Sequence, residues 1–185
     1  MTTTLGDLIN IHLTNVAVRM EKESLNILET GSIRSPEIRF RDGDGWSTFT
    51  LATHAKMHGG SAVSIDLDTR VAADVLAGYG LDKHIQLVTG HSIDVLTGYL
   101  AEGKTFDFIL LDSDNDADLI LHEYFIALRL IRDGGIIMID DVEPGSREVL
   151  KGNALIPHLK QVMKPYTLHK RSKNAISTGV AVVEF

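Results

Sequence analysis

Apolar residues follow two different spacings along this chain. Near the start they recur every three or four residues, which predicts a helix of about four turns with one apolar face: Leu5, Leu8, Ile9, Leu13, Val16, Ala17 and Met20. Short continuous apolar runs, typical of buried strands, follow at 25–28, 62–65, 84–89, 106–111 and 136–139. Helical spacing returns between these runs, at 46–57, 69–77, 92–100, 119–131 and 146–163.

Strands that alternate with helices indicate a parallel sheet covered on both faces. The run 106–111 is nearly all hydrophobic and suits a central strand. The last two strand-like runs, 166–173 and 179–185, are joined by a polar turn and predict a hairpin. We therefore predict an α/β fold with a doubly wound, mainly parallel seven-stranded sheet, a C-terminal antiparallel hairpin and helices on both faces.

Glycine and proline mark the expected helix ends. Asp133–Gly134–Gly135 should end the preceding helix, and Gly152 or Pro157 should interrupt the last one, because both residue types are unfavourable inside helices. A length of 185 residues suits one core rather than two. We expect a single domain over 1–185, in which residues 1–24 form a helix packed on the core.

Composition excludes several classes of function. A net charge of −7 argues against a general nucleic-acid or membrane-surface binder, since both need a basic footprint. The chain has no cysteine, so disulfides, thiolate metal sites and cysteine nucleophiles are excluded. No apolar run approaches the roughly 18 residues of a membrane span, and the Thr-rich start does not resemble a signal peptide. A cytoplasmic protein with no nucleic-acid or membrane partner is the expectation.

Polar residues stand at the end of every predicted strand up to the hairpin: Glu29-Thr30-Gly31, Asp66, Gly90-His91-Ser92, Asp112 and Asp140-Asp141. Strand ends are polar in many proteins simply because they meet water. In a doubly wound sheet, however, they also converge on the crevice where ligands bind. An acid after the second strand is placed to accept hydrogen bonds from ribose hydroxyls.

Three of these acids form a candidate metal site. Asp112, Asp140 and Asp141 end two strands that should be neighbours, and carboxylates about 4 Å apart repel by roughly 4 kcal/mol per pair at an effective dielectric near 20. A cation or a proton would offset that repulsion, and oxygen-only ligands suit Mg²⁺ or Ca²⁺, with Mn²⁺ also possible. The alternative is that one acid of the 140–141 pair caps the next turn while the other faces solvent.

The segment 43–48 carries the first two glycines of a dinucleotide fingerprint, and Asp66 follows at about the right distance. Thr48 stands in place of the third glycine. Asp42 and Asp44 flank the helix start, where they would repel a pyrophosphate and tolerate a cationic ligand. An NAD(P)-dependent oxidoreductase is therefore a second hypothesis.

Together these residues resemble the class I S-adenosylmethionine-dependent methyltransferases, whose fold is Rossmann-like. Glu29-Thr30-Gly31 is similar to the first motif of that class, Asp66 to its ribose-binding acid, and Gly90-His91-Ser92 to the segment beside the adenine. Regions 106–112 and 134–142 resemble the metal-dependent O-methyltransferases of the catechol and caffeoyl-CoA type. The resemblance implies a cofactor site at Glu29, Thr30, Gly31, Gly45, Trp46, Ser47, Asp66, His91, Ser92 and Asp112, and a divalent metal at Asp112, Asp140 and Asp141.

The implied reaction is O-methylation of a small hydroxylated acceptor, with Asp112 and His91 as candidate catalytic residues. Two departures qualify this prediction. The loop 32–44 separates glycines that the family keeps together, and Asn115 stands where those enzymes often have a lysine that deprotonates the substrate. An asparagine amide is not a general base, so the metal acidifies the hydroxyl, another residue such as His91 accepts the proton, or the protein binds cofactor without turnover.

Two further expectations concern partners. The loop arginines Arg34, Arg39 and Arg41 either recognise an anionic group of the acceptor or are solvated. A homodimer is the assembly that we expect if the chain associates.

Overall fold

The fold is a seven-stranded sheet between two layers of helices. The computed structural model describes residues 3–38, 46–173 and 176–185. Its strands are β1 (Leu25–Thr30), β2 (Gly60–Asp66), β3 (Gln86–Thr89), β4 (Phe106–Leu111), β5 (Ile131–Ile139), β6 (Thr167–Lys173) and β7 (Ile176–Glu184). Its helices are α1 (Leu5–Arg19), α2 (Ser47–His58), α3 (Arg70–Gly78), α4 (Ser92–Ala101), α5 (Ala117–Leu130) and α6 (Lys151–Gln161).

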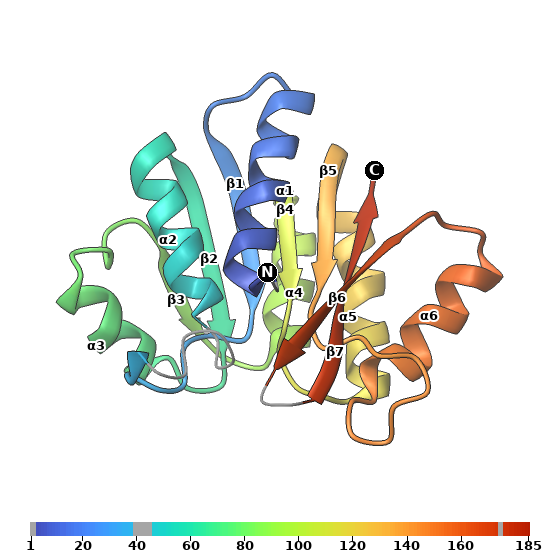
Figure 1. Cartoon of the computed structure of the whole chain (residues 1–185). Helices are drawn as coiled ribbons and strands as arrows, with labels where there is room; N and C mark the ends of the chain where they lie inside the picture. Colours follow the sequence, from blue (N-terminus) through green and yellow to red (C-terminus); the bar gives the residue numbers. More distant parts are fainter. Residues whose placement is uncertain (1–2, 39–45, 174–175) are drawn as a thin grey trace.

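The strand order is β3-β2-β1-β4-β5-β7-β6 (Figure 1). The first five strands are parallel, whereas β7 runs antiparallel to both β5 and β6. The predicted fold class is thereby confirmed, including the C-terminal hairpin. Strand β4 is buried along its whole length, as its continuous hydrophobicity predicts.

Helix α1 forms where the apolar stripe predicts it. Thr4 and Asp7 form a capping box, in which the Asp7 amide donates to the Thr4 hydroxyl at 3.1 Å and the Thr4 amide donates to the Asp7 carboxylate at 3.1 Å. These bonds satisfy backbone donors that the helix itself leaves unpaired. Its apolar stripe is buried in the core that also contains Leu25 and Ile27 of β1.

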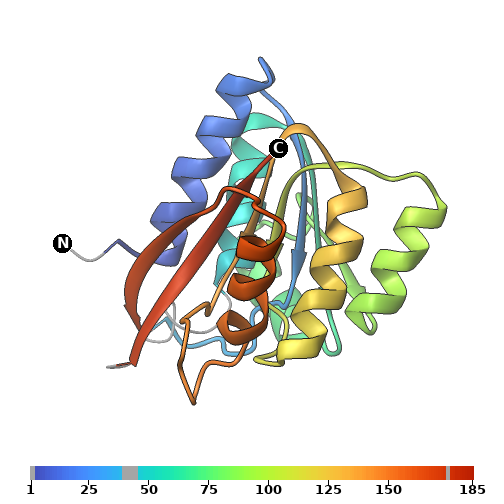
Figure 2. The ribbon, with the colours of Figure 1, turned by 90° about the vertical axis from the view of Figure 1, so that its right-hand side faces the viewer.

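The two layers of helices follow from the crossovers between parallel strands. Helices α1, α2 and α3 contribute buried residues to one face of the sheet, and α4, α5 and α6 cover the other (Figure 2). The helices thus bury the central strands, and in a sheet of this kind ligands bind at the carboxyl ends of the strands.

The parallel register aligns the carboxyl ends of four strands. Thr30 of β1 pairs with Ile65 of β2 and Leu111 of β4, and Leu111 pairs with Ile139 of β5. The residues that follow these positions are therefore neighbours in space, although more than a hundred residues separate the first from the last.

The prediction that Asp133–Gly134–Gly135 ends a helix is wrong. Helix α5 already ends at Leu130, and the glycine pair lies within β5. Gly134 has φ +83° and donates to the Phe185 carbonyl, while the Phe185 amide donates to Gly135. A Cβ on Gly135 would lie 2.8 Å from the Asp107 carbonyl oxygen. These glycines therefore permit close strand pairing.

The predicted interruption of the last helix is also wrong, since α6 is continuous through Gly152 and Pro157. Gly152 lies against the backbone, where an added Cβ would meet the Glu143 nitrogen at 2.7 Å. Pro157 and Asn153 are both exposed, so the carbonyl that loses its helical partner can bond to water.

Among residues 3–38, 46–173 and 176–185, no helix is long and apolar enough to cross a membrane.

Candidate functional site

A cavity of about 390 Å³ lies at the carboxyl ends of the central strands. Its walls bring together four of the residues predicted to bind a cofactor. The lining consists of Gly31, Arg34, Asp66, Leu67, Gly90, His91, Ser92, Ser113, Asp114 and Leu119. Sequence reasoning missed Ser113, Asp114, Leu67 and Leu119, which simply follow a strand or begin a helix.

Gly31 permits the close approach of two loops at the floor of this cavity. Its φ is +86°, and an added Cβ would lie 2.1 Å from the Asp112 carbonyl oxygen. The Gly31 amide donates to the Ile65 carbonyl at 2.8 Å, and the Asp112 amide donates to Thr30 at 2.9 Å. Only glycine can adopt this conformation at this distance without displacing the neighbouring chain.

Asp66 is fixed by the backbone amides of two loop residues. One carboxylate oxygen accepts from the Ser32 amide at 2.8 Å, and the other accepts from the Asp68 amide at 3.1 Å. Each carboxylate oxygen has a second lone pair that can accept a further bond. The neighbouring Asp68 instead pairs with Arg70 and does not line the cavity. This geometry allows Asp66 to receive hydroxyl donors of a sugar.

His91 and Ser92 lie at the start of α4. The Gly90 amide donates to the Asp66 carbonyl at 2.9 Å, which ties this segment to β2. His91 caps the helix, because its Nδ1 accepts from the Ile93 amide at 3.3 Å. A neutral ring in this arrangement has its proton on Nε2. The Nδ1 lone pair of His91 is therefore used by the helix cap.

Glu29 lies beneath the cavity and is fully buried. Its carboxyl group accepts from the Thr48 hydroxyl at 2.7 Å and the Ser64 hydroxyl at 2.6 Å. Burial, together with the nearby Asp112 charge, raises its pKa to about 8 against the opposing effect of the hydroxyl hydrogen bonds. Glu29 therefore supports the floor of the cavity without forming its wall, and is largely protonated at neutral pH.

A second buried carboxyl group, Glu123 of α5, was not predicted from the sequence. It accepts from the Thr30 hydroxyl at 3.3 Å, and burial raises its pKa although hydroxyl groups and Lys151 lower it. Its position in the middle of a helical apolar pattern gives no sequence signal.

Asp112, Asp140 and Asp141 come together as predicted. Each offers a carboxylate oxygen, and these oxygens all lie within 4.8 Å of one another. Asp141 has φ +55°, a backbone conformation that aspartate adopts more readily than most residues. Its Oδ1 accepts from the Thr178 hydroxyl of β7 at 3.1 Å. This oxygen-only donor set suits a hard divalent cation.

Lys151 is a further unpredicted member of the acidic group. Only 1% of the residue is exposed, and its Nζ lies 3.3 Å from Asp112 Oδ1. The acidic group thus already contains one positive charge. Lys151 begins α6, far from Asp112 in the sequence, so no local motif could reveal this contact.

The Asn115 side chain contacts the backbone that precedes α6. Its Nδ2 donates to the Glu148 carbonyl, and its Oδ1 accepts from the amides of Leu150 at 2.7 Å and Lys151 at 3.4 Å. Both ends of the amide thus bind the backbone that leads into α6. Asn115 fixes the start of that helix, and with it the position of Lys151.

Two further residues predicted to bind the cofactor, Trp46 and Ser47, do not line the cavity. Trp46 is buried against Ile33 and Val75, and its indole donates to the Ser35 carbonyl at 3.2 Å. Ser47 is also buried. Arg34 lines the cavity. Gly45, Arg39 and Arg41, together with Asp42 and Asp44, fall outside the described residues.

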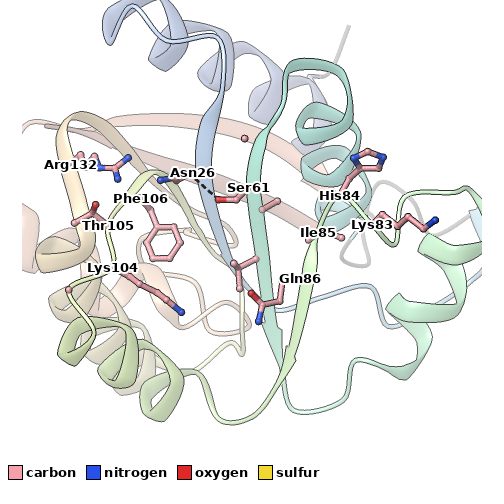
Figure 3. A pocket seen from close by; sticks show the side chains of 14 residues that line it. Asn26, Ser61, Lys83, His84, Ile85, Gln86, Lys104, Thr105, Phe106 and Arg132 are labelled. Carbon is pink, nitrogen blue, oxygen red and sulfur yellow. Dashed lines mark hydrogen bonds between the residues drawn. The ribbon is translucent and has the colours of Figure 1, made fainter.

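A second cavity, of about 630 Å³, lies at the opposite edge of the sheet, beside Asn26, Ser61 and Gln86 (Figure 3). It contains none of the predicted site residues. Two of its basic side chains are already paired, Arg132 with Asp107 at 2.8 Å and Lys104 with Glu102 at 2.9 Å. The convergence of predicted residues favours the cavity at the carboxyl ends as the functional site.

Comparison with known proteins shows similarity to methyltransferases. Residues 43–142, more than half of the chain, match the family model of the methyltransferase domain. A catechol O-methyltransferase of Niastella koreensis is 33% identical over 125 residues, which cover 65% of this chain and 50% of that protein. A flavonoid 3',5'-methyltransferase of Vitis vinifera is 30% identical over 88 residues, covering 44% and 37%. The chain therefore spans half or less of the length of these two relatives.

Solved structures share the fold. An O-methyltransferase from Bacillus cereus, in complex with SAH, superposes with a TM-score of 0.70 at 20% identity, covering 96% of this chain and 81% of the other. The MycE methyltransferase of the mycinamycin pathway, in complex with Mg and SAH, superposes with a TM-score of 0.63 at 15% identity, covering 95% and 48%. At this level of identity the similarity establishes the architecture alone.

Proposed function

The chain belongs to the methyltransferase domain family, and from this membership we propose that it transfers the methyl group of S-adenosylmethionine to a hydroxyl oxygen of a small acceptor. One observation carries this proposal. The cavity lined by Gly31, Asp66 and Ser92 and the acidic group of Asp112, Asp140 and Asp141 both lie at the carboxyl ends of the strands. A cofactor cradle and a candidate metal site thus share one edge of the sheet.

The cavity suits the nucleoside part of such a donor. Asp66 would accept the ribose hydroxyls, and the start of α4 at His91 and Ser92 would border the base. The acids around the cavity favour a cationic ligand over a phosphorylated one. This contrast, together with the family match, favours a sulfonium donor over the nicotinamide dinucleotide of the alternative hypothesis.

The proposed reaction is a single displacement, in which the acceptor oxygen bonds to the methyl carbon as the bond from that carbon to the sulfonium sulfur breaks. SAH leaves, and the hydroxyl proton passes to solvent. The protein's main tasks are therefore alignment of the two substrates and stabilisation of the developing oxyanion. Asp112, Asp140 and Asp141 would hold a divalent cation such as Mg²⁺ or Mn²⁺, which when bound supplies Lewis-acid polarisation of the hydroxyl. The relatives named for catechol and flavonoid methylation make a phenolic hydroxyl our proposed acceptor group.

We propose a proton acceptor other than the lysine that the family resemblance implies. Asn115 is committed to the backbone of residues 148–151, and His91 Nδ1 is occupied by the Ile93 amide. We therefore propose that the acceptor hydroxyl, which a divalent ion at Asp112, Asp140 and Asp141 would acidify, releases its proton to solvent without either side chain as a base. Under this proposal, His91→Ala weakens cofactor binding and leaves the pH dependence of methyl transfer unchanged.

Thermal unfolding with S-adenosylmethionine tests the cofactor site. We expect millimolar S-adenosylmethionine to raise the melting temperature, and Asp66→Ala to abolish that rise. Asp68→Ala is the matched control, because this acid stands two residues away and does not line the cavity. Absence of any rise in the unmutated protein, or a rise with NADH alone, would contradict the proposal.

Turnover is tested by formation of SAH with a panel of catechols and flavonoids, with and without Mg²⁺ or Mn²⁺. We expect methylation that depends on the metal and is lost in Asp140→Asn, whereas Asp118→Asn on the exposed surface of α5 retains it. Cofactor binding without methylation of any acceptor would instead support a binding protein that lacks turnover.

A further inference from the structure

We propose that Lys151 is a built-in cation of the acidic site, which offsets one of its three carboxylates and thereby limits the site to weakly held divalent ions. This inference rests on the metal site of the proposed function. It assigns to Lys151 a role in selecting the charge of the bound ion.

The burial of Lys151 carries the first step. Lysine is almost never fully buried unless it is paired, yet only 1% of Lys151 is exposed. Its Nζ lies 3.3 Å from Asp112 Oδ1, and the Asp112 carboxylate lies within 4.8 Å of those of Asp140 and Asp141. The ammonium group thus lies beside one of the three acids that would hold a metal.

The second step is that the backbone around Lys151 is fixed. The Asn115 side chain accepts from the amides of Leu150 and Lys151 and donates to the Glu148 carbonyl. On the next residue, Gly152 lies so close to Glu143 that an added Cβ would meet its nitrogen at 2.7 Å. These contacts direct the start of α6 towards the acidic group.

The third step is the charge of the group. The Lys151 ammonium offsets negative charge at Asp112, and it repels any cation that the three aspartates bind. This repulsion is stronger for a trivalent ion than for a divalent one. Since Coulomb repulsion grows with the charge of the ion, removal of the ammonium must favour trivalent ions more than divalent ones.

Calorimetric titration of the full chain with Mn²⁺ and with Tb³⁺, in the absence of S-adenosylmethionine, tests this role. We expect Lys151→Met to bind Mn²⁺ about tenfold more tightly than the unmutated protein, and to gain still more for Tb³⁺. Lys151→Arg keeps the positive charge and should retain the original preference between the two ions. Lys160→Met is the matched control, because Lys160 is exposed on the same helix.

Circular dichroism establishes that each variant is folded, and Lys151→Gln replaces Lys151→Met if the latter does not fold. Mn²⁺ affinity that is unchanged or weaker in the neutral variant would overturn the proposal, as would equal gains for the two ions or the same gain in Lys160→Met. Absence of Mn²⁺ binding in every variant would also overturn it. The thermal shift with S-adenosylmethionine, measured on the same proteins, shows whether the cofactor part of the proposed function survives such a failure.

Discussion

Replacing Glu29 by glutamine tests whether the floor of the cofactor cavity contains a protonated carboxyl group. Glutamine has nearly the same shape, and its amide oxygen can still accept from the hydroxyls of Thr48 and Ser64, which lie 2.7 and 2.6 Å from the carboxylate. It cannot ionise. The substitution therefore removes the titration while keeping the packing of the site.

The sign of the expected effect follows from the raised pKa of Glu29. Its ordinary value of 4.5 applies to the unfolded chain, and burial raises the folded value to about 8. Below pH 4.5 both states bind the proton, and the stability that depends on it is fully present. As the pH rises towards 8, the unfolded chain releases its proton while the folded protein retains it, so stability is lost. At about 1.4 kcal/mol for each unit of difference, the loss reaches about 5 kcal/mol at most.

Urea unfolding of both proteins between pH 5 and pH 9 measures this linkage. We expect the free energy of unfolding of Glu29→Gln, relative to the unmutated protein, to increase by about 2 to 5 kcal/mol across this range. Glu148→Gln serves as the control, because Glu148 is exposed and its side chain has no part in the cavity. A constant difference between Glu29→Gln and the unmutated protein would refute the assignment of a buried protonated carboxyl group.

Two further substitutions test the architecture around the site. Gly31→Ala should destabilise the protein by about 3 kcal/mol or more and abolish the thermal shift with S-adenosylmethionine, since its Cβ would lie 2.1 Å from the Asp112 carbonyl oxygen at a φ of +86°. Unchanged stability in urea would show that the close approach of Gly31 to Asp112 does not require glycine. Asn115→Ala should lower the free energy of unfolding by about 1 to 3 kcal/mol, because the backbone groups of Glu148 and Leu150 lose their partner. Asn115→Asp still accepts from the amides and should lose less stability, so equal losses in the two variants would contradict a role of the Asn115 side chain in fixing this backbone.

The local pattern of the sequence determined most of the fold. The spacing of apolar residues located α1 and all seven strands, because helices and strands bury residues with different periods. The sequence pattern wrongly predicted that Gly134–Gly135 ends a helix and that Gly152 interrupts one. Each of these glycines is required by a chain segment distant in sequence, Asp107 and Phe185 in the first case and Glu143 in the second.

The sequence predicted only those residues of the candidate site that follow the ends of strands. Asp66, Asp112, Asp140 and Asp141 could be placed together because parallel strands in register end at one edge. Lys151 and Glu123 reach the same place from helices on one face of the sheet, and only packing decides which helical residue points there. The sequence thus specified the acids of the site, whereas the tertiary structure alone supplied the cation beside them, because helix docking depends on contacts that no local pattern records.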